Sequence, residues 1–160
     1  MGKFNFDEEK FEKVKAEAEK LYETFELTYC PYFFEKIAFN AKGLRHLKFK
    51  SDQQARSNKD QYTRLSLLYL APKILNASHT LQGLWQTKKF EQYKTDGDWK
   101  YAMKDINFYE FIAVLDNVRV KVIIKEVLGG EKHFWSIIPY WSVNKIGSKR
   151  ILHSGQPDND

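Results

Sequence analysis

The sequence predicts an α+β fold in which N-terminal helices pack on a C-terminal four-stranded antiparallel sheet. Apolar residues recur at helical spacing in the first half of the chain, and the pattern changes to that of strands after about residue 79. Short turn segments separate the strands of the second half, which is typical of antiparallel neighbours. With 160 residues, of which 42% are apolar and 16% aromatic, the chain can bury one hydrophobic core.

The first predicted element is a helix from Asp7 to about Phe25. Its apolar residues recur every three or four positions, and Lys and Glu fill the positions between them. Asp7 suits the N-cap, and Glu8 and Glu9 place negative charge in the first turn, where the helix dipole favours it. We assign this helix to packing and not to chemistry.

A short strand is expected within residues 32–42, closing at Gly43, which permits a turn into the basic stretch that follows. A second helix is expected from Asp52 or Lys59 to Asn76. Pro72 should bend or end this helix, because proline lacks the backbone N–H that continues the hydrogen-bond ladder.

The second half of the chain is expected to form strands over residues 79–90, 108–115, 118–127 and 133–141. Asp116-Asn117 and Gly129-Gly130 supply the turns between the last three, which gives an antiparallel meander. The polar segment from Glu91 to Asp105 is expected to be a loop or a connection.

Alternation along the strands predicts a sheet with two different faces. In the segment 118–127, Arg119, Lys121 and Lys125 share one face, and the valines between them share the other. In the last strand, Ser136 and Tyr140 are expected on one face. The sheet should therefore offer an apolar face to the helices and a partly basic face on the other side.

The chain is expected to form one domain over residues 1–144, followed by a peripheral tail over residues 145–160 that lacks periodicity. Cys30 is the single cysteine, which excludes an intrachain disulfide and suits a reducing cytosol. No signal peptide and no apolar run of membrane-spanning length is visible. A cytoplasmic protein without a membrane partner is therefore expected.

Positive charge is concentrated in residues 43–64. The whole chain has a net charge of +5, but this stretch holds six Lys or Arg against two acids. His46, Lys48 and Lys50 would share a face if this segment is extended. Arg56 and Arg64 are eight residues apart, about two helical turns, and should lie on the same side. An imidazole beside fixed cations suits phosphoryl chemistry on nucleic acid.

Several other classes of site have no support. One cysteine and four scattered histidines give no zinc spacing, so neither a metal nor another cofactor is expected. No glycine-rich phosphate loop follows a strand, and no serine occupies a nucleophile elbow. Two plainer interpretations stay open for the basic stretch, because a charge run is usually a solvated surface and a histidine between leucines is often packed.

The order of these features resembles that of the phage and mobile-element nucleases grouped with barnase, EndoU, colicin-type tRNases and RelE-type toxins (the BECR nucleases). The resemblance spans roughly residues 32–141. It is carried by the run Ile-Ala-Phe-Asn-Ala-Lys-Gly-Leu-Arg-His-Leu-Lys-Phe-Lys of residues 37–50, by Arg56 and Arg64, and by residues 68–75. A polar side chain on the last strand completes it.

This resemblance implies a nuclease-like domain that cleaves RNA without a metal, by attack of the ribose 2′-OH on the adjacent phosphate. His46 would match the family's general acid or base, and Lys48 and Arg56 would stabilise the phosphorane. Ser136 or Tyr140 would match the polar position on the last strand. Supporting contacts to RNA would come from the remaining cations: Lys50, Arg64, Arg119, Lys121 and Lys125. A toxic nuclease also implies a neutralising partner, an antitoxin or immunity protein.

A non-catalytic RNA- or DNA-binding module is the alternative interpretation of the same basic face. In such a module the Lys and Arg side chains give salt-dependent affinity, and His46 is dispensable. A protein-interaction domain with an aromatic binding patch is a third candidate.

Overall fold

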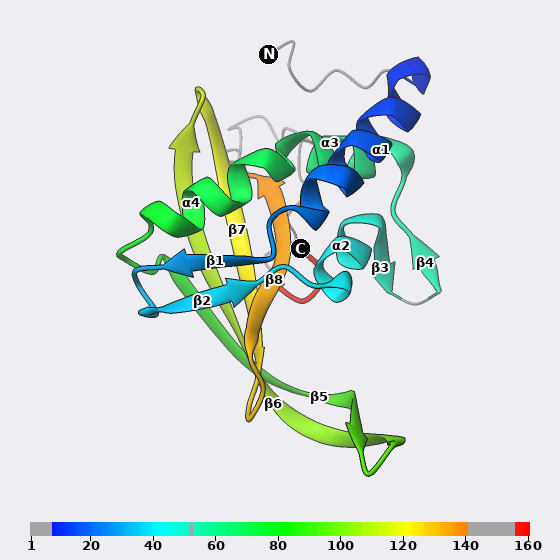
Figure 1. Cartoon of the computed structure of the whole chain (residues 1–160), viewed down its shortest axis with the longest axis vertical. Helices are drawn as coiled ribbons and strands as arrows, with labels where there is room; N and C mark the ends of the chain where they lie inside the picture. The colour runs from blue at the N-terminus through cyan, green and yellow to red at the C-terminus, as the bar shows by residue number, and fades with distance from the viewer. Residues whose placement is uncertain (1–7, 52, 141–155) are drawn as a thin grey trace, which may run out of the picture.

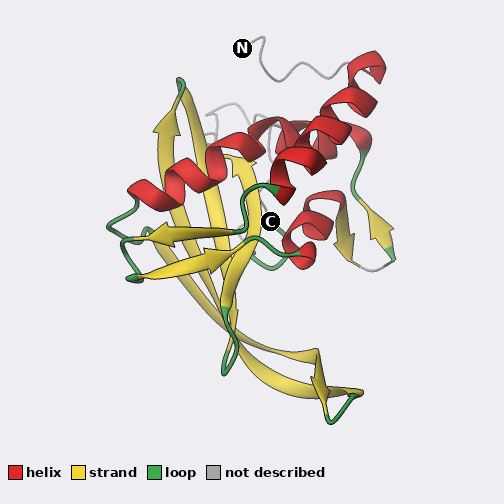
Figure 2. Cartoon of the chain, viewed as in Figure 1, coloured by secondary structure: helices red, strands yellow, loops and turns green. Residues whose placement is uncertain are grey.

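The computed structural model describes residues 8–51, 53–140 and 156–160. Within them the chain is an α+β protein whose main sheet has six strands in the order β1-β2-β8-β7-β6-β5 (Figures 1 and 2). The helices are α1 (Glu8–Glu23), α2 (Ala41–Lys48), α3 (Asn58–Leu67), the 3-10 helix η2 (Leu68–Leu70) and α4 (Ala71–Ala77). The main-sheet strands are β1 (Leu27–Cys30), β2 (Glu35–Ala38), β5 (Gly83–Thr95), β6 (Asp98–Leu115), β7 (Val118–Val127) and β8 (Lys132–Pro139). A separate ribbon pairs β3 (Phe49–Ser51) with β4 (Gln54–Ala55).

The predicted α+β class with a mostly antiparallel sheet is confirmed. Strands β5 to β8 form an antiparallel meander from the C-terminal half of the chain. Two further strands come from the N-terminal half, because β2 pairs in parallel with β8 and β1 pairs antiparallel with β2. The turn between β6 and β7 falls at Asp116 and Asn117, as expected, and both have positive φ (52° and 64°).

One face of the sheet carries the main hydrophobic core. Side chains of α1, α3, η2 and α4 pack there against Val120, Val122 and Ile124 of β7 and against Phe134 of β8. In Figure 2 these helices lie together on one side of the strands. Pro72 lies in the first turn of α4, where its missing N–H breaks no hydrogen bond, and it marks the end of the preceding helical run as predicted. The predicted α1 is also confirmed.

The basic stretch begins as a helix and not as a strand, so the extended conformation in which His46, Lys48 and Lys50 would share a face does not occur. Asn40 caps α2 by accepting a hydrogen bond from the Gly43 backbone N–H at 3.2 Å. A side chain at the N-cap satisfies a donor that the helix itself leaves unpaired. The helix winds His46 toward the sheet, whereas Lys50 lies on β3 and is exposed.

Gly43 lies within α2 and does not form the expected turn. A Cβ atom at this position would lie 2.3 Å from the Phe134 carbonyl oxygen and 2.7 Å from the Tyr22 hydroxyl. Glycine is therefore required here because α2 packs directly on the backbone of β8. This close approach brings His46 to the sheet.

The segment 91–105 is not a loop. It continues β5 and β6 around a tight turn at Asp96 and Gly97, whose φ values are 49° and 85°. An Asp-Gly pair is a strong signal for a two-residue hairpin turn. Strand β6 pairs with β7 only from Ile106 onward. Residues 88–105 therefore form a two-stranded extension, here called the arm, which curves away from the body in Figure 1.

Strand β8 contains a bulge that changes its predicted alternation. Ser136 pairs with Ile123 and Phe134 pairs with Ile124, so Trp135 is an extra residue between them. Phe134 faces the main core, whereas Trp135 packs with Ile123 in a smaller cluster on the opposite face. Ser136, paired with Ile123, lies on that second face too. Phe134 and Ser136 therefore lie on opposite faces, although simple alternation places residues two apart on the same face.

The replacement Gly43→Ala should destabilise the protein by about 1–3 kcal/mol, because the added methyl group collides with backbone that cannot move freely. Chemical denaturation measures this change. Gly130→Ala is a matched control, since its Cβ would meet only the Val127 carbonyl oxygen at 3.2 Å. Equal stability of the Gly43→Ala variant and the wild type would contradict the tight packing of α2 on β8.

Candidate functional site

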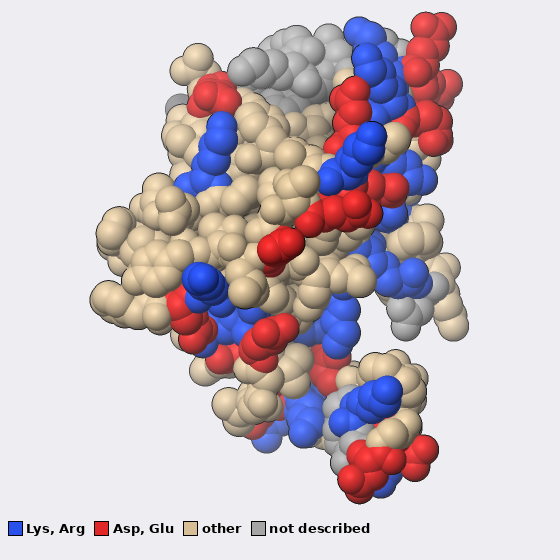
Figure 3. Space-filling view, viewed as in Figure 1, with Lys and Arg blue, Asp and Glu red and all other residues tan. Residues whose placement is uncertain are grey.

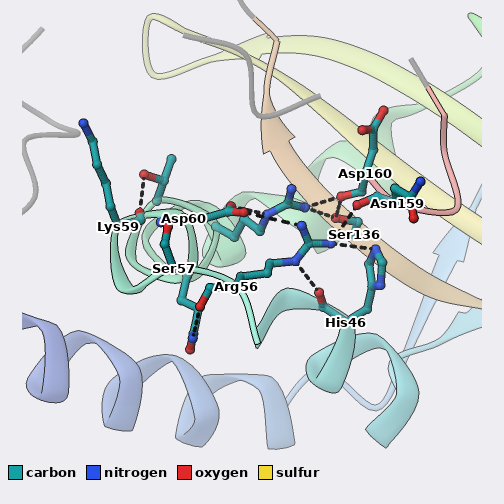
Figure 4. Close-up of polar contacts among 11 residues, drawn as sticks. His46, Arg56, Ser57, Lys59, Asp60, Ser136, Asn159 and Asp160 are labelled. Atoms are coloured by element: carbon teal, nitrogen blue, oxygen red, sulfur yellow. Dashed lines mark hydrogen bonds and ion pairs between the residues drawn. The ribbon is translucent and has the colours of Figure 1, made fainter. Parts of the chain in front are cut away.

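Four of the residues singled out in the sequence meet between α2, α3 and β8. His46 comes from α2, Arg56 precedes the N-cap of α3, Arg64 lies in α3, and Ser136 lies in β8. Their exposed fractions are only 4%, 5%, 0% and 0%, respectively. Figure 4 shows His46, Arg56 and Ser136 converging from these elements. We call Arg56, Arg64 and Ser136, together with His46, the arginine site.

Asp60 organises the two arginines. Its carboxylate accepts hydrogen bonds from Arg64 Nε at 2.6 Å and from Arg56 Nη1 at 3.4 Å. Arg56 and Arg64 are each four residues from Asp60, so the first turns of α3 place all three on one side. Ser57 caps the helix by accepting a hydrogen bond from the Asp60 N–H, which fixes where α3 begins.

His46 is held by packing on one side and by Arg56 on the other. Its ring stacks on Trp135 with 4.0 Å between centroids and a 20° interplanar angle. Arg56 donates from Nε to the His46 carbonyl oxygen at 2.8 Å, and its Nη2 lies 3.0 Å from His46 Nε2. A guanidinium has no acceptor, so His46 Nε2 must accept and the ring proton must lie on Nδ1.

The surroundings of His46 keep it neutral. Burial lowers its pKa well below 6.5, and the positive charges of Arg56 and Arg64 lower it further. Burial and the nearby Arg64 also lower the pKa of Arg56, to about 10, so Arg56 stays charged at neutral pH. The site at pH 7 therefore combines a neutral imidazole with two buried cations.

Main-chain oxygens of residues 159 and 160 occupy the centre of the site. Arg56 Nη2 donates to the Asn159 carbonyl oxygen at 2.8 Å. Ser136 Oγ donates to the Asp160 carbonyl oxygen at 2.5 Å, and Arg64 Nη1 donates to the same oxygen. Figure 4 shows this segment beside Ser136 and Arg56. The donors of the arginine site thus converge on oxygen acceptors, as they would on an anion.

One donor of the site has no partner among the described residues. Arg64 Nη2 is buried and makes no hydrogen bond to them, although its neighbour Nη1 also donates to Ser136 Oγ at 2.8 Å. An unpaired buried donor of a charged group costs free energy. The arginine site can therefore accept an anion with more acceptor oxygens than the main chain of residues 159 and 160 provides.

The other predicted site residues make no part of the arginine site, although Lys125 stands beside it, over the Trp135 ring at 4.3 Å. Lys48 pairs with Glu19 of α1 at 2.6 Å. Lys121 is buried and pairs with Glu110 at 2.5 Å, and Lys125 is buried and pairs with Glu91 at 2.7 Å. Each of these cations therefore has a carboxylate partner within the chain.

Arg119 and Tyr140 lie together near the end of β8. The Arg119 guanidinium stands over the Tyr140 ring at 4.9 Å, and Tyr140 N donates to the Arg119 carbonyl oxygen at 2.8 Å. Of the two hydroxyls considered on the last strand, Ser136 is the one that the structure brings to His46 and the arginines.

Sequence reasoning missed Asp60, Trp135 and residues 159–160. The spacing of Asp60, four residues from each arginine, was a usable signal for a bridging carboxylate. Trp135 contacts His46 because of the bulge in β8, and no residue pattern predicted this bulge. Residues 145–155 of the predicted tail lie outside the described residues, whereas residues 156–160 pack against the domain and Asp160 is buried.

Two negative findings apply to the described part of the chain. There, no group of three or more His, Cys, Asp or Glu side chains is placed to hold a metal ion. In the same residues, no helix has the length and apolar character needed to cross a membrane.

No protein-family model, curated protein or solved structure matches this chain. The geometry of the arginine site is therefore the basis on which a function can be proposed.

The stability of the protein should fall as the pH drops below about 6.5, the ordinary pKa of an unfolded histidine. Burial lowers the pKa of His46 well below this value and that of His133 to about 4. At a pH between the folded and unfolded pKa values, the unfolded chain therefore binds more protons than the folded chain. Each histidine can contribute up to about 1.4 kcal/mol per pH unit. Chemical denaturation between about pH 5 and 7 measures the slope.

His46→Gln and His133→Gln test the source of this slope, because glutamine does not titrate and its amide oxygen can still accept from Arg56 at position 46. Each replacement should flatten the pH dependence, and the double variant should flatten it most. An unchanged slope in both variants would show that neither histidine is held neutral.

Proposed function

We propose that this chain is a metal-independent endoribonuclease of the toxin or mobile-element type, which cleaves RNA by 2′-OH attack on the adjacent phosphate. The observation that carries the proposal is the convergence of Arg56, Arg64 and Ser136 on main-chain oxygens beside a neutral histidine. Two cations, a hydroxyl donor and an imidazole are the groups that such a reaction needs, and none of them depends on a metal.

In this proposal an RNA phosphate takes the place of the carbonyl oxygens of Asn159 and Asp160. Arg56, Arg64 and Ser136 donate to its oxygens, and the unpaired Nη2 of Arg64 gains a partner. Fixed donors of this kind stabilise the additional charge of a phosphorane more than that of the ground state. Asp60 pairs with both arginines and keeps their guanidinium groups within the site.

His46 would act as the general base. Its low pKa keeps Nε2 unprotonated at neutral pH, which is the form that accepts the 2′-OH proton. The 2′ oxygen then bonds to phosphorus, the 5′ oxygen leaves and takes a proton from solvent, and a 2′,3′-cyclic phosphate remains. Arg56 Nη2 would turn from His46 to the bound phosphate.

Residues 156–160 must leave the site before RNA can enter it. The Asp160 charge also acts favourably on both arginines, as a phosphate would. Lys89 pairs with Asp158 and holds the segment from the base of the arm. The segment therefore competes with substrate for the same donors.

The BECR resemblance is retained as part of this proposal. Helices that precede an antiparallel sheet, and a histidine and a last-strand hydroxyl in one site, support it. Lys48 and Tyr140 receive no catalytic role, because Lys48 is paired with Glu19 and Tyr140 is associated with Arg119. The same resemblance leads us to propose a cytoplasmic location and an antitoxin or immunity protein as partner.

A non-catalytic RNA- or DNA-binding module is the second candidate. It is favoured by one observation, the hydrogen bond between Arg56 and His46 Nε2, which occupies the lone pair that a base would use. In this case the arginine site binds a phosphate without cleaving the strand.

The purified protein should cleave single-stranded RNA in the presence of EDTA and leave 2′,3′-cyclic phosphate ends. His46→Ala should lower the cleavage rate by about 100-fold or more, since general-base catalysis contributes about 10²–10⁴-fold. Ser136→Ala should lower it less, by about 10-fold, because one neutral donor to the phosphate is lost while both arginines remain. Gel analysis of end-labelled RNA measures both effects.

His79→Ala is the matched control, because His79 is exposed and lies outside the arginine site. Circular dichroism verifies that each variant is folded. If the wild type retains RNA in a salt-sensitive manner but produces no fragments, the binding module is correct and the nuclease is not.

A further inference from the structure

A groove lies between the arm and His46, which is the residue that the groove shares with the arginine site. It has a volume of about 310 Å³, and His46 and Trp135 line it. One wall is formed by α2 and β3 and the other by the arm. Figure 3 shows the surface hollowed between the tip of the arm and the body, with blue side chains on the body above the hollow.

The arm exposes large aromatic side chains to this groove. Phe90, Trp99 and Tyr101 line it and are 69%, 60% and 70% exposed. In the strand register Phe90 pairs with Met103, and residues 92 and 94 pair with Tyr101 and Trp99, so the aromatics share one face of the arm. A contiguous exposed aromatic surface is uncommon unless it binds something.

The arm also has little reason to exist for stability. Its two strands pair with each other and, in the part of the chain that the structure describes, with no third strand. An isolated two-stranded hairpin is only marginally stable in water. Strand β5 has 13 residues and β6 has 18, whereas β7 has ten. The part of β5 and β6 that extends beyond the end of β7 is the arm, and it places the aromatic face beside the groove.

The opposite wall is basic. Lys42 and Arg45 of α2 and Lys50 of β3 line the groove and are exposed. The guanidinium of Arg45 stands over the Phe49 ring at 4.6 Å. Among the described residues that line the groove, Glu91 is the one acidic side chain, and it is paired with Lys125. The groove therefore has an aromatic wall and a positively charged wall.

We propose that this groove binds single-stranded RNA and guides it into the arginine site. The bases stack on Phe90, Trp99 and Tyr101, and the phosphates face Lys42, Arg45 and Lys50. Base faces are available for such stacking only in an unpaired strand, so duplex RNA is excluded. This inference deepens the proposed function, on which it rests for the choice of RNA as the ligand.

Fluorescence anisotropy with a labelled 2′-O-methyl oligonucleotide tests the groove, because the methyl group prevents cleavage and leaves only binding. Trp99→Ala and Tyr101→Ala should each weaken binding about 5- to 100-fold, the effect of losing one base stack. Trp99→Phe should recover part of the affinity. Phe34→Ala is the matched aromatic control, since Phe34 is 84% exposed and lies in the turn between β1 and β2.

A second pair of variants tests the charged wall. Lys50→Ala should weaken binding and reduce its salt dependence, whereas Lys36→Ala on β2 should do neither. A duplex of the same sequence should bind the wild type more weakly than the single strand.

The outcome separates the groove from the proposed nuclease. If Trp99→Ala and Tyr101→Ala bind as tightly as Phe34→Ala, the groove proposal is wrong, whether or not the wild type cleaves RNA. Absence of any binding, or a preference for duplex, would also overturn it. If the arm variants lose binding while the wild type fails to cleave unmodified RNA, the groove proposal stands and the nuclease does not.

Discussion

The burial of two arginines beside a single bridging carboxylate is the constraint on which the site depends. Removing a guanidinium from water costs several kcal/mol unless charges and hydrogen bonds replace its hydration. Asp60 neutralises part of this charge, and the carbonyl oxygens of His46, Asn159 and Asp160 accept further hydrogen bonds. Among the described residues, Arg64 Nη2 still lacks a partner. The arrangement therefore leaves a buried donor without an acceptor there, and an anion can supply one.

The fold keeps these cations in place through contacts made far from them in the chain. Gly43 lets α2 approach the backbone of β8, and the bulge at Trp135 places both a ring and the Ser136 hydroxyl on the side of the arginines. Ser57 fixes the start of α3, and thereby the spacing of Arg56, Asp60 and Arg64. The packing of α2 on β8, the bulge in β8 and the cap of α3 thus determine where His46, Ser136 and the two arginines lie.

The sequence predicted the class of fold and the basic region, because both depend on local patterns. Helical spacing identified α1, and alternation in β7 separated its valines from Arg119, Lys121 and Lys125. It also selected four residues that do meet, His46, Arg56, Arg64 and Ser136. It did not predict that Lys48, Lys121 and Lys125 would find acidic partners, because those partners come from distant elements.

Two further errors have simple physical causes. A shared face for His46, Lys48 and Lys50 was considered for an extended segment, but Asn40 caps a helix there, and the sequence analysis did not identify this cap. The segment 91–105 was expected to be a loop because it is polar, yet its Asp-Gly turn and alternating aromatics specify a hairpin. The segment is polar because its strands extend beyond the hydrophobic core and expose most of their side chains to solvent. No local residue pattern indicates the bulge in β8 or the contacts of residues 159 and 160 with the arginine site.

His46 belongs to the arginine site and also lines the groove beside the arm, so the two regions meet at this residue. The central claim is that the phosphate of a nucleic acid replaces the main chain of residues 159 and 160 at Arg56 and Arg64. The most direct test is NMR of the isotope-labelled full chain titrated with a 2′-O-methyl dinucleotide. We predict that the Nε–H signals of both arginines and the amide signals of Asn159 and Asp160 shift together. Shifts confined to other residues, with these four signals unchanged, would contradict the account.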